Sequence, residues 1–167
     1  MIPALYKVVT HGEGFLAVMP RPRADDWLDD EIGGLQSLGV GAIASLLEPT
    51  EVTELGLQDE AEITRRRGLA FFSFPIPDRG TPRNLLAFRE FVRDLAMQVQ
   101  SGIGLAIHCR AGIGRSGITA AATLVALGHD HSLAFELISS ARGLRVPDTG
   151  SQIKWFEHNW RSFDCAS

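Results

Sequence analysis

The chain has 167 residues, of which 45% are hydrophobic and 22% charged, and its formal net charge is −4 at pH 7. These values are typical of a globular protein and predict a single domain over residues 1–167. The mildly acidic balance argues against binding nucleic acid or an anionic membrane through bulk charge. The sequence shows no signal peptide and no apolar run approaching the ~20 residues of a membrane span. Two cysteines, Cys109 and Cys165, are too few for a disulfide framework, which favours a cytoplasmic location.

The N-terminal half alternates short apolar runs with polar segments. In chain order, it predicts strands at 6–9 and 15–19, a helix at 28–38, a strand at 40–47, a helix within 50–67 and a strand at 69–74. Glycines and prolines separate these segments, as expected for turns and element ends.

The C-terminal half has mostly helical spacing of its apolar residues. It predicts a helix at 83–100, a strand at 105–107, and helices at 118–127, 133–142 and 151–160. Strands alternating with helices indicate an α/β fold, with a central, mainly parallel twisted sheet of about five strands flanked by helices. In such sheets, ligands bind at the carboxyl ends of strands. Asp78 and Cys109 both follow predicted strands, so we expect them to share one crevice.

The segment 104–117 reads GLAIHCRAGIGRSG, which predicts a buried strand, a tight loop and a helix start. Backbone N–H groups in such a loop form an anion site. Residues 112–117 also match the dinucleotide pattern GxGxxG. That pattern requires a second parallel strand soon after the helix, and none is predicted here, so we disfavour dinucleotide binding.

A cysteine and an arginine bracket this loop. Five residues separate Cys109 from Arg115, so a curled loop would form a cradle of N–H groups for a tetrahedral dianion. Arg115 can grip two oxygens of that anion. Its positive charge and the helix N-terminus favour the Cys109 thiolate, which is a nucleophile aimed at phosphorus. Gly112 and Gly114 allow close backbone approach and unusual dihedral angles.

With His108 and Ser116 included, the sequence HCRAGIGRS resembles the signature loop of the protein tyrosine phosphatase superfamily, in its dual-specificity and small prokaryotic branch. The resemblance implies a protein tyrosine phosphatase-like fold and hydrolysis of phosphomonoesters through a phosphocysteine intermediate, without metal or cofactor. It implies a phosphorylated protein as substrate, with phosphotyrosine expected and phosphoserine or phosphothreonine left open. The phosphate-binding residues it implies are Arg110, Ala111, Gly112, Ile113, Gly114 and Arg115.

The resemblance also assigns roles outside the cradle. Expulsion of the leaving oxygen requires a proton, and Asp78, in the segment FPIPD, matches the family's general acid. Asp148 is a rival that lies after the loop, where the family keeps no acid. Ser116 is expected to donate to the Cys109 sulfur, and His108 to support the loop. Gln152 resembles a glutamine that orients the attacking water, with an exposed helix position as the alternative.

Two other functions remain open from the sequence. A phosphoinositide or inositol-phosphate phosphatase is an alternative, although Ala111 and Ile113 stand where such enzymes usually carry lysines. A binding module without activity is disfavoured because the cysteine, arginine and aspartate are all present.

The remaining histidine and cysteine residues give weaker indications of function. His129 and His131 lack a third metal ligand nearby, which favours a solvated loop over a metal site. Cys165 could form a protective disulfide with Cys109 on oxidation, although a cysteine so near a terminus more often has no role. The oligomeric state is open, with a monomer favoured.

Overall fold

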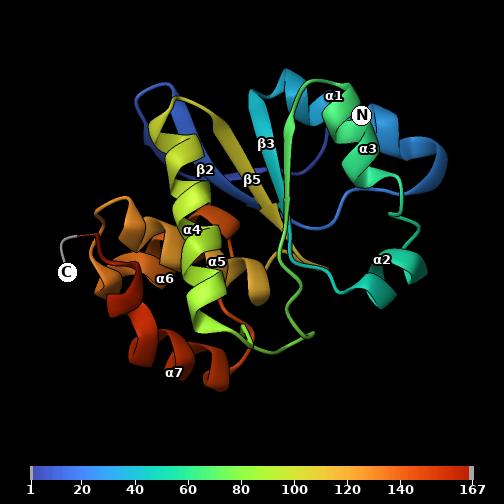
Figure 1. The fold of residues 1–167 in the computed structure, drawn as a ribbon. Helices are drawn as coiled ribbons and strands as arrows, with labels where there is room; N and C mark the ends of the chain where they lie inside the picture. Colours follow the sequence, from blue (N-terminus) through green and yellow to red (C-terminus); the bar gives the residue numbers. More distant parts are fainter. Residues whose placement is uncertain (1, 166–167) are drawn as a thin grey trace.

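The computed structural model describes residues 2–165 and is built around a five-stranded sheet in the order β1-β2-β5-β3-β4 (Figure 1). Strands β2, β5, β3 and β4 are parallel, whereas β1 pairs antiparallel with β2. This is the predicted α/β fold with a mainly parallel sheet. The strands are β1 (Tyr6–His11), β2 (Gly14–Met19), β3 (Val40–Ser45), β4 (Ala70–Ser73) and β5 (Gly104–His108).

Helices cover both faces of the sheet (Figure 1). The helices are α1 (Leu28–Ser37), α2 (Pro49–Glu54), α3 (Glu60–Arg66), α4 (Leu85–Gln100), α5 (Arg115–Ala126), α6 (Ala134–Arg142) and α7 (Gly150–Asn159), with short 3-10 turns η1 (Asp25–Trp27), η2 (His131–Leu133) and η3 (Trp160–Phe163). Helices α4 and α5 pack on β2 and β5, while α1 packs on β3 and α3 on β4. No helix within residues 2–165 is both long and apolar enough to cross a bilayer.

The sheet has a separate apolar core on each face, which explains the unbroken apolar runs in the sequence. In β2, Leu16 and Val18 pack toward α4 and α5, whereas Phe15, Ala17 and Met19 pack on the opposite face. A parallel sheet covered on both faces buries every residue of its central strands. All residues of β2 and β5 are buried accordingly.

Helix α5 is the central helix of the fold, because all twelve of its residues are buried. Its small side chains let α4, α6 and α7 pack around it. The helix begins at Arg115, three residues before the predicted start at 118. The cysteine loop therefore leads directly into a buried helix N-terminus.

The segment 50–67 folds as two helices, α2 and α3, where one was predicted. Pro49 occupies the first turn of α2, and Gly56 follows the helix end with a φ of +68°. A glycine in the left-handed region ends a helix at little steric cost. The break between the helices lets α2 and α3 each place a carboxylate beside the cysteine loop.

Candidate active site

The loop 109–114 lies at the carboxyl edge of the sheet, between β5 and α5. Its carbonyls are held from outside. The Arg21 N–H donates to the Arg110 carbonyl at 3.2 Å, and the guanidinium of Arg142 donates to the carbonyls of Ala111 and Gly112 at 3.1 and 3.3 Å. Engaging these outward carbonyls favours a curled loop with its N–H groups facing inward. Arg142 has this position on α6, and the sequence analysis did not identify it.

Each loop glycine has its own structural reason. Gly112 has a φ of +74°, and a Cβ atom there would lie 2.5 Å from the Met19 carbonyl oxygen. Gly114 has an ordinary φ of −78°, but a Cβ atom there would lie 2.8 Å from an Asp148 oxygen and 3.0 Å from the Gln152 amide. The expected unusual backbone angle therefore applies to Gly112 alone, whereas a Cβ atom at Gly114 would displace the ends of the Asp148 and Gln152 side chains.

Cys109 is buried, with 3% of its surface exposed, and its sulfur lies 3.3 Å from the Ser116 hydroxyl. Burial raises the pKa of the thiol. Hydrogen bonds from the Ser116 hydroxyl and backbone, and from the Ile113 and Gly112 N–H groups, outweigh burial and place the Cys109 pKa below its ordinary value. The loop therefore favours the thiolate, which is the reactive form of cysteine.

A Ser116→Ala substitution is expected to raise the Cys109 pKa, because it removes a hydrogen bond that stabilises the thiolate. A hydrogen bond to a charged group contributes about 1.5–3 kcal/mol, which corresponds to roughly one to two pH units. The rate of Cys109 alkylation by iodoacetamide, measured against pH, should shift to higher pH by this amount. An unchanged profile would show that the hydroxyl does not stabilise the sulfur.

His108 supports the loop from beneath through a carboxylate that the sequence analysis missed. Its Nε2 lies 2.6 Å from Oε1 of Glu60, and its Nδ1 lies 3.1 Å from the Cys109 carbonyl oxygen. Burial lowers the pKa of His108, but Glu60 and the Cys109 carbonyl raise it above its ordinary value. In the protonated state both ring nitrogens donate, so the ring ties α3 to the cysteine loop.

Arg115 is held by a second unpredicted carboxylate, Glu51 on α2. Its Nη1 and Nη2 donate to the two carboxylate oxygens at 2.7 and 2.9 Å, and Nη1 also donates to the Ile76 carbonyl at 3.0 Å. The Arg115 and Glu51 side chains are only 2% and 7% exposed. Both Nη atoms are fixed by this fork, while Nε has no hydrogen-bond partner among residues 2–165 and remains available to an anion.

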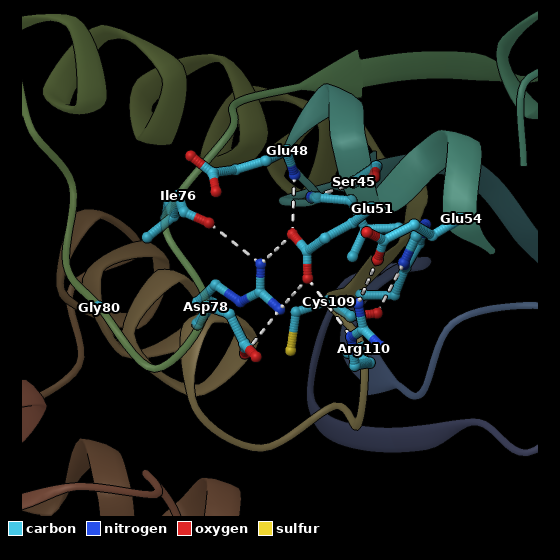
Figure 2. A network of polar contacts seen from close by, with 12 residues as sticks. Ser45, Glu48, Glu51, Glu54, Ile76, Asp78, Gly80, Cys109 and Arg110 are labelled. Atoms are coloured by element: carbon cyan, nitrogen blue, oxygen red, sulfur yellow. Dashed lines mark hydrogen bonds and ion pairs between the residues drawn. The ribbon is translucent and has the colours of Figure 1, made fainter.

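Asp78 reaches the same guanidinium from the loop after β4. Its Oδ1 accepts from Arg115 Nη2 at 3.0 Å, and its side chain is 57% exposed. Figure 2 shows Glu51, Ile76 and Asp78 around this guanidinium, with the Cys109 sulfur nearby. The loop is held in this position because Phe74 and Ile76 donate backbone hydrogen bonds to the carbonyls of Ser45 and Leu46 at the end of β3.

One cavity of about 130 Å³ joins these groups, which confirms the predicted common crevice. It is lined by Asp78, Arg79, Cys109, Arg110, Ala111, Gly114, Arg115 and Asp148. Such a volume suits a tetrahedral anion above the sulfur. Asp148 therefore lies at the rim of the same cavity, although it follows the loop by many residues in sequence. Ile113 is not among the lining residues, but its N–H donates to the sulfur.

Gln152 is fully buried, so the exposed alternative is wrong. It stands in the first turn of α7, where its backbone N–H donates to the Thr149 hydroxyl and its side-chain oxygen accepts from the Thr149 N–H. Its amide nitrogen donates to the Gly80 carbonyl at 3.1 Å. Gln152 thus connects α7 to the loop that carries Asp78.

The remaining candidates lie away from this cavity. Cys165 donates to the Ala126 carbonyl at the far end of α5, whereas Cys109 precedes its start. A twelve-residue helix is about 18 Å long, so the disulfide alternative does not fit this fold. The His131 ring stacks on Trp160 at 3.6 Å. Residues 2–165 contain no cluster of three or more potential metal ligands.

A match to a protein family spans most of the chain. Residues 17–129 match the family described as "Polymorphic toxin system, DSP-PTPase phosphatase". Among curated proteins, cyclin-dependent kinase inhibitor 3 from Rattus norvegicus is 27% identical over 124 residues, which is 74% of this chain. This chain covers only 58% of the length of that relative.

Solved structures share the fold. A kinase associated phosphatase with its catalytic-site cysteine substituted by serine superposes with a TM-score of 0.84 at 20% identity, covering 100% of this chain and 98% of that one. The active form of Tk-PTP superposes with a TM-score of 0.72 at 24% identity, covering 96% and 99%.

Proposed function

Because the chain belongs to the DSP-PTPase phosphatases of polymorphic toxin systems, we propose that it is a cysteine-dependent protein phosphatase. Its substrates are phosphotyrosine and also phosphoserine or phosphothreonine monoesters in proteins. The observation that carries this proposal is the buried Cys109 sulfur, which accepts hydrogen bonds from Ser116 and loop N–H groups beside the Arg115 guanidinium. A phosphate group in this cavity would have a thiolate below it and donors around its oxygens.

In the proposed first step, the Cys109 thiolate attacks phosphorus and the bond from phosphorus to the substrate oxygen breaks. Asp78 gives its proton to that leaving oxygen. Arg115 and the N–H groups of residues 110–115 stabilise the charge on the equatorial oxygens. The products are the dephosphorylated alcohol and a phosphocysteine.

In the second step, water attacks the phosphocysteine and Asp78 takes a proton from it. The phosphorus–sulfur bond breaks, and the Ser116 hydroxyl, 3.3 Å from Sγ, stabilises the departing thiolate. Inorganic phosphate leaves, and the enzyme returns to its starting state. The contact between Gln152 and Gly80 gives Gln152 a role in positioning the Asp78 loop.

Rapid-mixing kinetics with an aryl phosphate tests the reaction. We expect a burst of aryl alcohol with one equivalent per enzyme, followed by slower turnover, because the intermediate forms before it is hydrolysed. Acid quenching should trap phosphate on Cys109. An absence of both burst and turnover would favour the binding module without activity.

A panel of phosphorylated substrates tests which class of phosphate ester the enzyme hydrolyses. The loop positions of Ala111 and Ile113 carry no cation, and Arg110 is engaged by Glu51 and Glu54 at 3.4 and 3.6 Å. Asp148 adds negative charge at the rim. We therefore expect phosphopeptides to be hydrolysed faster than polyphosphorylated inositides. The reverse order would favour the phosphoinositide alternative.

An Asp78→Asn variant is expected to lose turnover by about 10²–10⁴-fold, because asparagine cannot supply a proton to the leaving oxygen. Binding of inorganic phosphate should fall little, since Arg115 and the loop remain. The measurement is kcat with an alkyl and an aryl phosphate, together with calorimetry of phosphate binding. The loss should be larger with the alkyl ester, whose leaving group needs the proton more. Unchanged turnover would move the acid role to another residue, with Asp148→Asn as the matched comparison.

A further inference from the structure

Arg142, the last residue of α6, reaches the cysteine loop from outside the catalytic cavity. Helix α6 packs against β1 at the edge of the sheet. From there the Arg142 Nε donates to the Gly112 carbonyl at 3.3 Å, and its Nη2 donates to the Ala111 carbonyl at 3.1 Å. Arg142 is not among the residues that line the catalytic cavity. It therefore contacts the backbone of the loop and leaves free the space that a phosphate would fill.

The two carbonyls that Arg142 holds belong to the same peptide units as two N–H groups of the cradle. A peptide unit is planar and trans, so its carbonyl and its N–H point in opposite directions. The Ala111 carbonyl shares a unit with the Gly112 N–H, and the Gly112 carbonyl shares a unit with the Ile113 N–H. These two N–H groups donate to the Cys109 sulfur. Holding the two carbonyls outward thus directs both N–H groups inward.

The loop itself restrains these two peptide units only weakly. Gly112 lies between them, with a φ of +74° and no Cβ atom, so the units on either side of it can rotate at little steric cost. Within residues 2–165, neither carbonyl accepts a hydrogen bond from any group other than Arg142. The guanidinium supplies the restraint that the glycine does not.

An aromatic ring holds the Arg142 guanidinium in place. Its central carbon lies 4.3 Å from the centre of the Tyr6 ring, at the start of β1, which is a cation–π contact. No carboxylate within the described part of the chain forms an ion pair with Arg142. The side chain is half-buried, so solvent screens its charge only in part. This charge therefore adds to the positive field at the loop, which favours a thiolate and a bound phosphate dianion.

We infer that Arg142 is a positioning residue of the active site, whose guanidinium aims the Gly112 and Ile113 N–H groups at the Cys109 sulfur and at a phosphate above it. The fork geometry of arginine is required, because one side chain must hold two successive carbonyls. The effect on phosphate rests on the proposed phosphatase function, whereas the effect on the thiol does not.

Alkylation of Cys109 by iodoacetamide, measured against pH in a Cys165→Ser background, tests the effect on the thiol. Arg142→Ala should move the profile to higher pH by about one unit or more, because the N–H groups that stabilise the thiolate lose their orientation. Arg142→Lys keeps the charge but cannot hold both carbonyls, so its profile should move by about half a unit or more. Arg93→Ala, on an exposed position of α4, is the matched control and should leave the profile unchanged.

A merely structural role of Arg142 would give a different result. It would lower the midpoint of urea denaturation and leave the alkylation profile where it is. An unmoved profile in folded Arg142→Ala would therefore overturn the inference. If Arg142→Ala does not fold, the Arg142→Lys profile decides in the same way.

Kinetics with an aryl phosphate test the effect on the reaction. Arg142→Ala should lower kcat by about 10²-fold, the usual loss when a transition-state donor is misplaced. The acid limb of kcat/KM should move to higher pH together with the alkylation profile. A kcat within about twofold of wild type would overturn the role in turnover, since it is no larger than the effect of a surface change.

Chemical rescue separates the guanidinium group from its charge. Guanidinium chloride at a concentration that does not unfold the protein should restore part of the kcat of Arg142→Ala, because the ion can bind the two carbonyls. Ammonium chloride at the same ionic strength should not. Equal effects of the two salts would overturn the requirement for a fork. If the wild-type protein hydrolyses no phosphate ester, the proposed function fails, while the alkylation profiles still decide the role of Arg142.

Discussion

A Cys109→Ser variant is expected to lose aryl-phosphate hydrolysis by about 10⁴-fold or more, which is the scale seen when an enzyme loses its nucleophile. Serine fits the buried site with little change in shape. The serine hydroxyl does not ionise near neutral pH, however. The hydrogen bonds that lower the pKa of the Cys109 thiol are too few to ionise a hydroxyl in its place. Steady-state turnover and acid-quench trapping measure the loss.

The second cysteine provides the matched control. Cys165 is exposed and lies at the opposite end of α5 from the cavity. Cys165→Ser should keep turnover within about twofold, since surface changes away from a site have small effects. Inorganic phosphate should still bind to Cys109→Ser, because Arg115 and the loop N–H groups remain. Hydrolysis at the normal rate by Cys109→Ser would rule out the thiolate mechanism.

The geometry of the cysteine loop could be predicted because its determinants are local. An apolar strand, two glycines and a small-residue helix follow one another within residues 104–126. The joint cavity of Asp78 and Cys109 was also predictable, since parallel strands bring their carboxyl ends to one edge. A dinucleotide site was disfavoured for a separate reason, the lack of a predicted strand after the helix, and in the described part of the chain no strand follows β5.

The two carboxylates beneath the loop could not be predicted in the same way. Glu51 lies 64 residues from Arg115, and Glu60 lies 48 residues from His108. Both stand in a polar segment whose pattern is typical of a solvated helix face. Only the packing of α2 and α3 against the sheet edge buries them, and no local signal in the sequence reports that packing. The one local signal in this segment was Gly56, which indicates a break between two helices.

Gln152 illustrates a different limit. Its place in the first turn of α7 follows from the capping pattern Thr149 to Gln152, which is a local signal. Its burial against Gly80 and Gly114 depends on how α7 docks beside α5. Sequence periodicity gave no information on this docking, so the choice between exposed and buried remained open until the fold was known.

Arg115→Ala is expected to lower both stability and turnover, because Arg115 neutralises a buried carboxylate as well as binding phosphate. Removing one partner of a buried ion pair costs about 3–5 kcal/mol, since the other charge is left unpaired. Turnover should fall by at least about 10²–10³-fold, the usual loss when a transition-state donor is removed. Urea denaturation and kcat measurements give the two effects separately. Arg115→Lys should retain more stability but little turnover, because lysine cannot form the fork with Glu51.

A double substitution separates the two roles of Arg115. Adding Glu51→Gln to Arg115→Ala removes the unpaired buried charge, so the double variant should be more stable than Arg115→Ala alone. Turnover should not return, since the phosphate still lacks its guanidinium.

Burial raises the pKa of Glu51, but hydrogen bonds from Arg115, the Glu48 N–H and Arg110 bring it below the ordinary value of 4.5. The stabilisation from this pair is therefore present above pH 4.5 and is lost as the pH falls through the lowered pKa of Glu51. The difference in unfolding free energy between wild type and Arg115→Ala should shrink over that range, and a difference independent of pH would show that Arg115 stabilises the fold through packing alone.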